Sequence, residues 1–212
     1  SDSHACHRDK RVQNCAERAS ARNVGVVCEC LARYAGLLAN HLCSGFRNSI
    51  GRVFLVCTLF EDNAEFAYGF FHAQDAIRKE LPDVIMIPST GGAAGMTPEE
   101  RLQPTELFPE MATLDCGTCN FGDEIFDNTM PTMRAFGKRM LENNIKPEYE
   151  CFELGHIDTI LGMAKKGEVP AHPMQFNFVL GVHGCTPATV ENLAFFASKI
   201  PAGSTWTVSG VG

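Results

Sequence analysis

The 212-residue chain has no long apolar run, although 45% of its residues are hydrophobic. No stretch approaches the ~18 consecutive apolar residues that a membrane-spanning helix needs, so no membrane partner is expected. Residues 1–10 carry several charged side chains and match neither a secretory signal nor a transit peptide. Together these absences favour a cytoplasmic protein.

The chain also lacks an excess of positive charge. Its formal net charge is -7, whereas nucleic-acid-binding proteins usually present basic surfaces, so nucleic acid is not an expected partner. The apolar content is too high for intrinsic disorder, and the length is enough to bury a sizeable core.

Proline and methionine are missing from the first 81 residues, because all 11 prolines and all 8 methionines follow Leu81. At an average usage of about 5%, roughly four prolines would be expected there. Residues 1–74 hold 8 basic and 7 acidic residues (net +1), and residues 75–212 hold 10 and 18 (net -8). Six of the ten cysteines fall within the first 57 residues. We therefore divide the chain into segments 1–74 and 75–212.

The second segment alternates strand-like and helix-like patterns. Strand-like runs cover residues 84–87, 111–116, 148–153, 174–180 and 205–209. Helices are expected from Thr97 and over residues 131–144, 156–166 and 189–199. Thr97-Pro98-Glu99-Glu100 predicts a capping box with proline at the first helical position, and Gly167 is expected to end the third helix. Such alternation predicts a parallel α/β sheet with helical crossovers.

Polar and glycine residues follow each strand, at what would be one face of the fold. This favours a (β/α)₈ barrel of the TIM type over an open doubly wound sheet. A complete barrel needs roughly 250 residues. With five strands and four helices recognisable, an incomplete barrel is expected.

The first candidate site follows the strand at 84–87, where the chain reads Ser89-Thr90-Gly91-Gly92. Backbone N–H groups can converge on an anion in such a turn, and the two hydroxyls add donors. A carboxylate or phosphate of a ligand would fit there. The alternative is a connecting loop without a ligand.

Cys116 and Cys119 have the spacing of a metal or redox pair, but no second pair lies at a matching distance. This favours structural, unpaired cysteines over half of a zinc site.

Glu148 and Glu150 share one face of a strand because side chains alternate with a period of two. A carboxylate inside a barrel is costly unless it is paired or functional. Glu150 could therefore act as a general base or orient a substrate amine, or it could be a solvated residue at a strand end. His156 opens the next helix and is expected to cap or pack.

From about residue 76 onward, the chain resembles the β-keto acid cleavage enzymes. The matching stretches occur in the family's order and at compatible spacings over some 137 residues: 82–85, 89–92, 95–101, 109–112, 120–123, 145–148, 150–152, 154–156, 178–181, 187–189, 191–193 and 205–206.

The resemblance implies a zinc-dependent (β/α)₈ barrel, usually a homo-oligomer. The family exchanges acyl groups between a β-keto acid, such as 3-keto-5-aminohexanoate of lysine degradation, and the co-substrate acetyl-CoA. The products are acetoacetate and a new CoA thioester. The metal acts as a Lewis acid on the keto carbonyl.

Carried over to this chain, the resemblance makes Ser89 and Glu150 the expected catalytic residues. Ser89, Thr90, Gly91 and Gly92 would hold the substrate carboxylate or the reacting carbonyl. Thr113 and Asn120 are further expected contacts, although the side chain of Thr113 could instead face the helices. Glu150 would recognise a substrate amino group or position a neighbouring side chain.

The metal ligands of the family are not found. The family uses a His-x-His pair on an early strand and a Glu near the last strands, but this chain contains no His-x-His. The region expected to hold the Glu would follow Gly212, so we expect a chain cut short at this end. A catalytic zinc site usually has three protein ligands, and no metal ligand is predicted here.

Residues 1–74 share neither the motifs nor the amino-acid usage of the family, and we expect them to come from a shifted reading frame. The alternative is a replacement domain, such as a zinc module using Cys28, Cys30, His41 and Cys43.

Three functional hypotheses follow. In the first, the gene encodes a β-keto acid cleavage enzyme, and this chain alone has no activity. In the second, the chain is a non-catalytic fragment. The third is an unrelated barrel that binds a phosphorylated or carboxylate ligand at Ser89–Gly92.

Overall fold

The computed structural model describes residues 54–57, 78–79, 85–92, 95–171 and 173–211. Contacts divide the chain into two compact units, Ser1–Ile85 and Met86–Gly212. The zinc-module alternative at residues 28–43 lies outside the described residues, as does most of the segment assigned to a shifted frame. No helix in the described ranges has the length and apolar character needed to cross a membrane.

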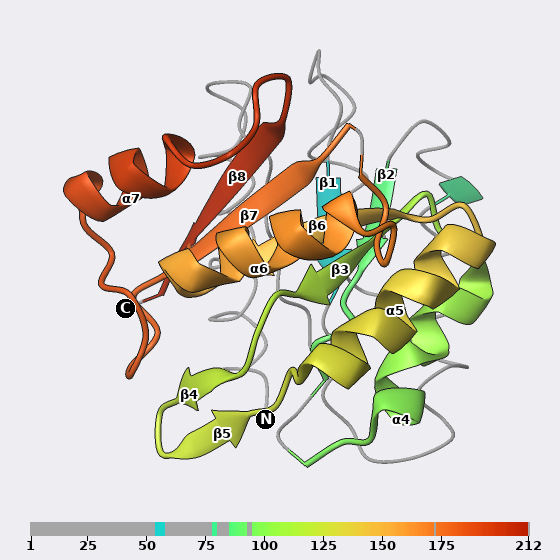
Figure 1. The fold of residues 1–212 in the computed structure, drawn as a ribbon. Helices are drawn as coiled ribbons and strands as arrows, with labels where there is room; N and C mark the ends of the chain where they lie inside the picture. Colours follow the sequence, from blue (N-terminus) through green and yellow to red (C-terminus); the bar gives the residue numbers. More distant parts are fainter. Residues whose placement is uncertain (1–53, 58–77, 80–84, 93–94, 172, 212) are drawn as a thin grey trace. The chain divides into compact units, whose positions relative to one another are not determined.

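Strands and helices alternate along most of the described chain, shown in Figure 1. The strands are β1 (Phe54–Cys57), β2 (Ile85–Pro88), β3 (Met111–Asp115), β4 (Cys119–Phe121), β5 (Glu124–Phe126), β6 (Lys146–Cys151), β7 (Gln175–Leu180) and β8 (Thr205–Gly210). The helices are α4 (Pro98–Leu102), α5 (Met130–Glu142), α6 (Leu154–Lys165) and α7 (Val190–Ala197), with a 3₁₀ turn, η2, at Gln103–Leu107.

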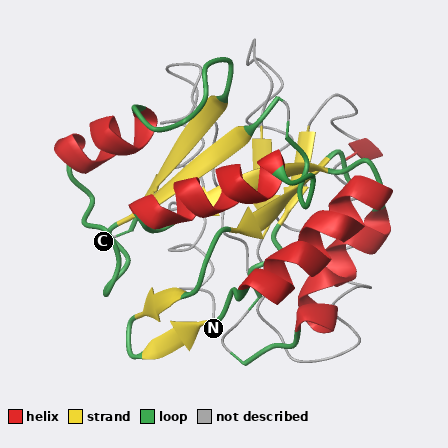
Figure 2. Cartoon of the chain, in the orientation of Figure 1, coloured by secondary structure: helices red, strands yellow, loops and turns green. Residues whose placement is uncertain are grey.

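Four strands form the main sheet of the second unit, in the order β3-β6-β7-β8, and every neighbouring pair is parallel. Helices α5, α6 and α7 contact β3, β6 and β7, respectively. Figure 2 shows α5 and α6 lying across one face of the strands. Their residues join those of the sheet in one hydrophobic core, which includes Leu114, Phe136, Ile160, Phe178 and Phe196.

The opposite face of the sheet carries polar side chains. In register across the strands lie Thr113, Glu148 and Gln175, followed one layer further by Asp115, Glu150 and Asn177. An open doubly wound sheet has helices on both faces, whereas a barrel sheet has helices outside and functional side chains inside. In the part of the chain that the structure describes, the helices that contact the sheet lie on one face and the polar side chains on the other, in agreement with the predicted partial (β/α)₈ barrel.

Local sequence signals set the helix boundaries. The hydroxyl of Thr97 accepts from the Glu100 N–H at 3.3 Å, and the Glu100 carboxylate accepts from the Thr97 N–H at 2.8 Å. This confirms the predicted capping box of α4. Gly167 has a φ of +72° after the end of α6 and donates its N–H to Ala164, as expected of a C-terminal glycine.

Two features differ from the sequence predictions. The strand predicted at 148–153 begins two residues earlier, at Lys146, and includes Pro147. Pro147 pairs with Ala112 on β3, whereas the pairing of β6 with β7 begins only at Glu148. The missing N–H of proline therefore interrupts no hydrogen bonds between β6 and β7. The second difference is the antiparallel β4–β5 hairpin, which closes through the two residues Gly122 and Asp123.

Two helical glycines provide a matched test of this packing. A Cβ at Gly137 of α5 would lie 2.5 Å from both the Glu168 carbonyl oxygen and Val169 Cγ1, whereas a Cβ at Gly162 of α6 would meet nothing within 4 Å. We expect Gly137→Ala to lower the free energy of unfolding by about 1–3 kcal/mol through overpacking. Gly162→Ala should raise it by roughly 0.5–1 kcal/mol, the helix propensity gain of alanine. Chemical denaturation of both variants checks this, and equal effects would contradict the packing of α5 against residues 168–169.

Candidate functional site

The turn that follows β2 is hydrogen-bonded to the middle of β3. The Thr90 N–H donates to Thr113 Oγ1 at 2.9 Å, and the Thr90 hydroxyl donates to the Thr113 carbonyl at 2.7 Å. Both threonines are fully buried. Thr113 therefore faces the polar side of the sheet and not the helices, since its neighbours Ala112 and Leu114 belong to the core under the helices.

The two glycines of the turn differ in their surroundings and backbone conformation. A Cβ on Gly91 would lie 3.2 Å from Ser89 Oγ and 3.5 Å from Asp115 Oδ2, so the backbone passes close to the carboxylate. Gly92 has a φ of +64°, a backbone conformation that favours glycine. The turn thereby brings Ser89 beside the carboxyl end of β3.

The donors of this turn are partly occupied within the protein. Gly91 donates its N–H to Ser89 Oγ at 3.1 Å, and the Thr90 N–H is taken by Thr113. Two of the backbone N–H groups expected to bind an anion therefore already have acceptors. The Ser89 hydroxyl accepts from Gly91, is partly exposed and has no acceptor for its own proton among the described residues, so it can donate to a ligand.

A buried arginine that the sequence analysis did not single out as a site residue holds the turn in place. Arg101 of α4 is 4% exposed and lies between the rings of Phe126 and Phe136, with Cζ 5.1 and 5.2 Å from their centroids. Its Nε donates to the Thr90 carbonyl at 2.9 Å, and one terminal nitrogen donates to the Asp127 carbonyl at 2.8 Å.

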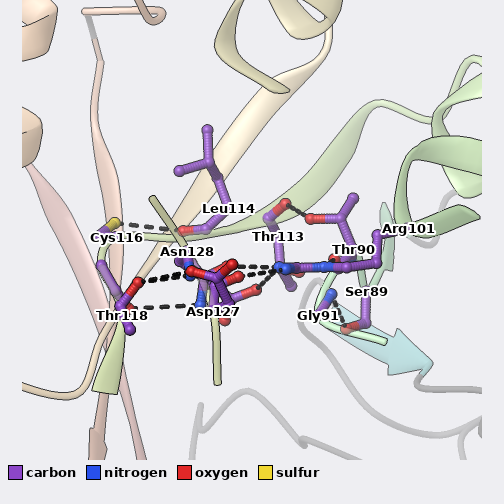
Figure 3. A network of polar contacts seen from close by, with 12 residues as sticks. Ser89, Thr90, Gly91, Arg101, Thr113, Leu114, Cys116, Thr118, Asp127 and Asn128 are labelled. Atoms are coloured by element: carbon purple, nitrogen blue, oxygen red, sulfur yellow. Dashed lines mark hydrogen bonds and ion pairs between the residues drawn. The ribbon is translucent and has the colours of Figure 1, made fainter. Parts of the chain in front are cut away.

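The other terminal nitrogen of Arg101 reaches two side chains, Asn128 Oδ1 at 2.5 Å and Asp115 Oδ2 at 3.4 Å. Asn128 is held in turn by Thr118, whose hydroxyl accepts from the Asn128 N–H at 2.8 Å. Figure 3 shows the guanidinium between the Ser89–Gly91 turn and the segment around Asp127 and Asn128. Burial lowers the pKa of Arg101, and the charges of Asp115 and Asp127 oppose this shift.

Asp115 also meets Glu150, which lies beside it in register on β6. Burial raises the pKa of Asp115, while the charge of Arg101 and a hydrogen bond with Glu150 lower it. The pKa of Glu150 lies well above its ordinary value, because of burial first and then the charges of Asp115 and Glu148. Burial and the neighbouring charges thus favour the neutral form of Glu150 more strongly than that of Asp115, which lies next to the guanidinium.

One buried oxygen of Asp115 lacks a hydrogen-bond partner. Asp115 Oδ1 accepts from no donor among the residues that the structure describes. A proton on Glu150 supplies the donor for the hydrogen bond between the two carboxyl groups. Asn177 Nδ2 completes the environment by donating to Glu150 Oε1 at 3.4 Å.

Glu148 lies one layer deeper on the same face. Its Oε1 accepts from Gln175 at 3.3 Å and from the Thr207 hydroxyl at 3.1 Å, while Oε2 is buried without a partner among the described residues. Burial raises the pKa of Glu148, and these two hydrogen bonds lower it. Two glutamates predicted to share a face thus do share it, and each lies in a polar network.

The remaining predicted residues lie away from this carboxyl pair. Asn120 is exposed on β4, with its side chain against Gly184. His156 packs its ring against Gly117 and Phe152, and its Nδ1 accepts from the Phe152 N–H at 3.3 Å. Burial lowers the pKa of His156. The prediction of a capping or packing histidine therefore agrees with the structure.

Cys116 and Cys119 do not form a joint site. Cys116 lies in the core under the helices and contacts Cys151, whereas Cys119 contacts Cys185. Among the residues that the structure describes, no three His, Cys, Asp or Glu side chains are grouped so as to hold a metal ion. The zinc that the resemblance implies therefore has no fitting ligand set in this part of the chain.

Replacing Glu150 tests where the proton resides. A carboxyl group whose native pKa is raised binds more protons in the native than in the unfolded state, so the free energy of unfolding falls as pH rises between the two pKa values. Glu150→Gln keeps a neutral hydrogen-bond donor and removes this fall of the free energy of unfolding with pH. We expect the stability of the variant relative to the original chain to increase as pH rises from about 4.5, the ordinary glutamate value.

Denaturant unfolding at a series of pH values measures this difference. The matched control is Glu106→Gln on an exposed side chain of η2, which should stay within about 0.5 kcal/mol at every pH. A Glu150→Gln difference that does not change with pH would contradict a protonated Glu150.

Comparisons with known proteins identify the relatives of this chain. The sequence profile of the beta-keto acid cleavage enzymes matches residues 66–212, more than two thirds of the chain. A 3-keto-5-aminohexanoate cleavage enzyme from Fusobacterium nucleatum subsp. nucleatum is 58% identical over 139 residues, covering 65% of this chain and 50% of the relative. A 3-oxoadipate:acetyl-CoA acetyltransferase from Cupriavidus necator is 32% identical over 146 residues, covering 68% and 51%, respectively.

Among solved structures, ObcA in a ternary complex with a C4-CoA adduct and oxalate matches with a TM-score of 0.53 and 15% identity, covering 61% of this chain and 33% of ObcA. This likeness supports the TIM-barrel type of fold. The chain spans about half the length of the curated relatives it matches. On the profile match and these identities, the chain belongs to the β-keto acid cleavage enzyme family.

Proposed function

We propose that residues 75–212 supply part of the active site of an enzyme that exchanges acyl groups between a β-keto acid and acetyl-CoA. The observation that carries the proposal is the meeting of the Ser89 turn and the Asp115–Glu150 pair at the carboxyl end of one parallel sheet. In barrel enzymes the chemistry occurs at this end of the strands. The 58% identical relative favours 3-keto-5-aminohexanoate as the β-keto acid.

The proposed role of Ser89 follows from its hydrogen bonds. Its oxygen is occupied by the Gly91 N–H, so the hydroxyl proton points to another acceptor. The keto oxygen or the carboxylate of the substrate would be that acceptor. A donor placed where negative charge develops stabilises the transition state of carbon–carbon cleavage. Thr90 and Thr113 would support this role by fixing the turn, and Gly91 and Gly92 by letting it pass close to Asp115.

The proposed role of Glu150 depends on its proton. A substrate ammonium beside Glu150 would add positive charge at the pair and lower the pKa of the glutamate, since opposite charges favour ionisation. Glu150 would then release its proton and hold the ammonium as a charged partner. In the absence of an ammonium group the pair would keep a single negative charge, balanced by Arg101. The site would thus select a substrate that carries a cationic amino group.

Asn120 lies on the β4–β5 hairpin, so a contact with the substrate would come from this hairpin. No step is assigned to zinc here, because the described residues offer no fitting ligand set. We further propose that the complete enzyme is a cytoplasmic homo-oligomer of lysine degradation. The present chain should have no activity alone, since the family's metal ligands have no counterpart in its sequence.

A chimera tests the function directly. The matched half of the Fusobacterium nucleatum relative is replaced by the 139-residue segment of this chain, and formation of acetoacetate from 3-keto-5-aminohexanoate and acetyl-CoA is measured. We expect turnover by the chimera and none by the present chain. Ser89→Ala in the chimera should lower kcat by about 10²-fold, as for loss of a donor to a developing oxyanion.

The matched control is Ser198→Ala, at an exposed hydroxyl that bonds the end of α7, which should leave turnover unchanged. A folded chimera without activity would contradict the proposal, as would equal activity of the two serine variants. Turnover by the present chain would contradict only the expectation that it is inactive.

A further inference from the structure

Two cysteine thiols from distant parts of the sequence meet beside the carboxyl edge of the sheet. Cys119 begins β4, and Cys185 lies in the connection from β7 to α7. Their side chains lie close enough for each thiol to shift the pKa of the other. Both pack against the same small cluster, formed by Phe126, Phe152, Val179 and Val182.

Further contacts hold the two segments in this position. Cys185 Sγ donates to the Asn120 carbonyl at 3.0 Å, and the Gly122 N–H donates to the His183 carbonyl at 3.0 Å. Gly184 lies so close to Asn120 that an added Cβ would come within 2.6 Å of Asn120 Cβ. The contact between the thiols is therefore supported by backbone bonds on either side of it.

The chain provides an internal comparison in Cys116 and Cys151. Cys151 likewise lies close enough to shift the pKa of Cys116, but both residues are fully buried in the core under the helices. Cys119 and Cys185 each retain some solvent exposure. A soluble oxidant can therefore reach Cys119 and Cys185 but not Cys116 and Cys151.

From this geometry we propose that Cys119 and Cys185 form a reversible disulfide on reaction with a small-molecule disulfide such as oxidised glutathione. Cys185 loses its proton, attacks one glutathione sulfur and expels the first molecule of reduced glutathione. The Cys119 thiol then loses its proton, attacks the Cys185 sulfur of the mixed disulfide and expels the second. The two cysteine sulfurs lose two electrons in all, and oxidised glutathione gains them.

Cys185 is the expected first nucleophile. Burial raises the pKa of both thiols, but the shift of Cys119 is large, and the hydrogen bond from Cys119 lowers the pKa of Cys185. Attack needs the thiolate, so the reaction should be slow at neutral pH and is best followed at mildly alkaline pH. The bond would join the β4–β5 hairpin to the β7–α7 connection. That hairpin leads to Asp127 and Asn128, which bind Arg101.

Peptide mapping after incubation of the folded 212-residue chain with oxidised glutathione tests the proposal. Free thiols are alkylated before digestion, which separates the pairs. Trypsin leaves Cys116 and Cys119 on peptide 102–134, Cys151 on 140–165 and Cys185 on 167–199. We expect 102–134 joined to 167–199, with Cys119 as the linked residue on fragmentation. Dithiothreitol should release the two peptides, and the cross-linked chain should melt at a higher temperature than the reduced chain.

Two variants make the result specific. Cys185→Ser should abolish the linked pair, and the matched Cys151→Ser, which removes a thiol of the buried pair, should leave it intact. The proposal is overturned if Cys185 remains free under these conditions or stays as a glutathione adduct. It is equally overturned if Cys119 links to Cys116 or to any of the six cysteines in residues 1–57.

Discussion

The buried guanidinium of Arg101 is the constraint on which the carboxyl edge of this sheet depends. A charged group out of water is costly unless hydrogen bonds and an opposite charge compensate for lost hydration. Arg101 obtains them from the Thr90 and Asp127 carbonyls, Asn128 and Asp115. Since these acceptors belong to three separate segments of the chain, satisfying one side chain fixes the relative positions of all three.

The charge of Arg101 also sets the protonation of its neighbours. The guanidinium lowers the pKa of Asp115 against the effect of burial, and the charge of Asp115 in turn raises the pKa of Glu150. A neutral glutamic acid at the end of a barrel strand is prepared to donate a hydrogen bond, and it can ionise when a cation arrives. The same interaction that stabilises the turn after β2 thus prepares the chemistry proposed for β6.

Much of this could be predicted from the sequence, because the relevant signals are local. Apolar runs and a capping box located the strands and α4, and the period of two placed Glu148 and Glu150 on one face. The hairpin had a signal too, the Gly122-Asp123 turn, but its strands have only three residues each. No local signal in the sequence predicted the role of Arg101, because its hydrogen-bond acceptors are brought together only by the tertiary fold. Cys116 and Cys119 were expected not to form half of a zinc site, but the neighbouring thiol of each, Cys151 and Cys185, could not be predicted for the same reason.

Native-state hydrogen exchange in Arg101→Met tests most directly whether one side chain couples these segments. The Thr90 and Asn128 amides, both hydrogen-bonded to threonine hydroxyls, should exchange at least about tenfold faster, the change expected for a local loss of ~1.4 kcal/mol. Amides of α6 should change much less. Arg134→Met, which removes a partly exposed ion pair with Glu168, should leave both amides unaffected. Unchanged exchange at Thr90 and Asn128 in Arg101→Met, or equal acceleration throughout α6, would contradict the account.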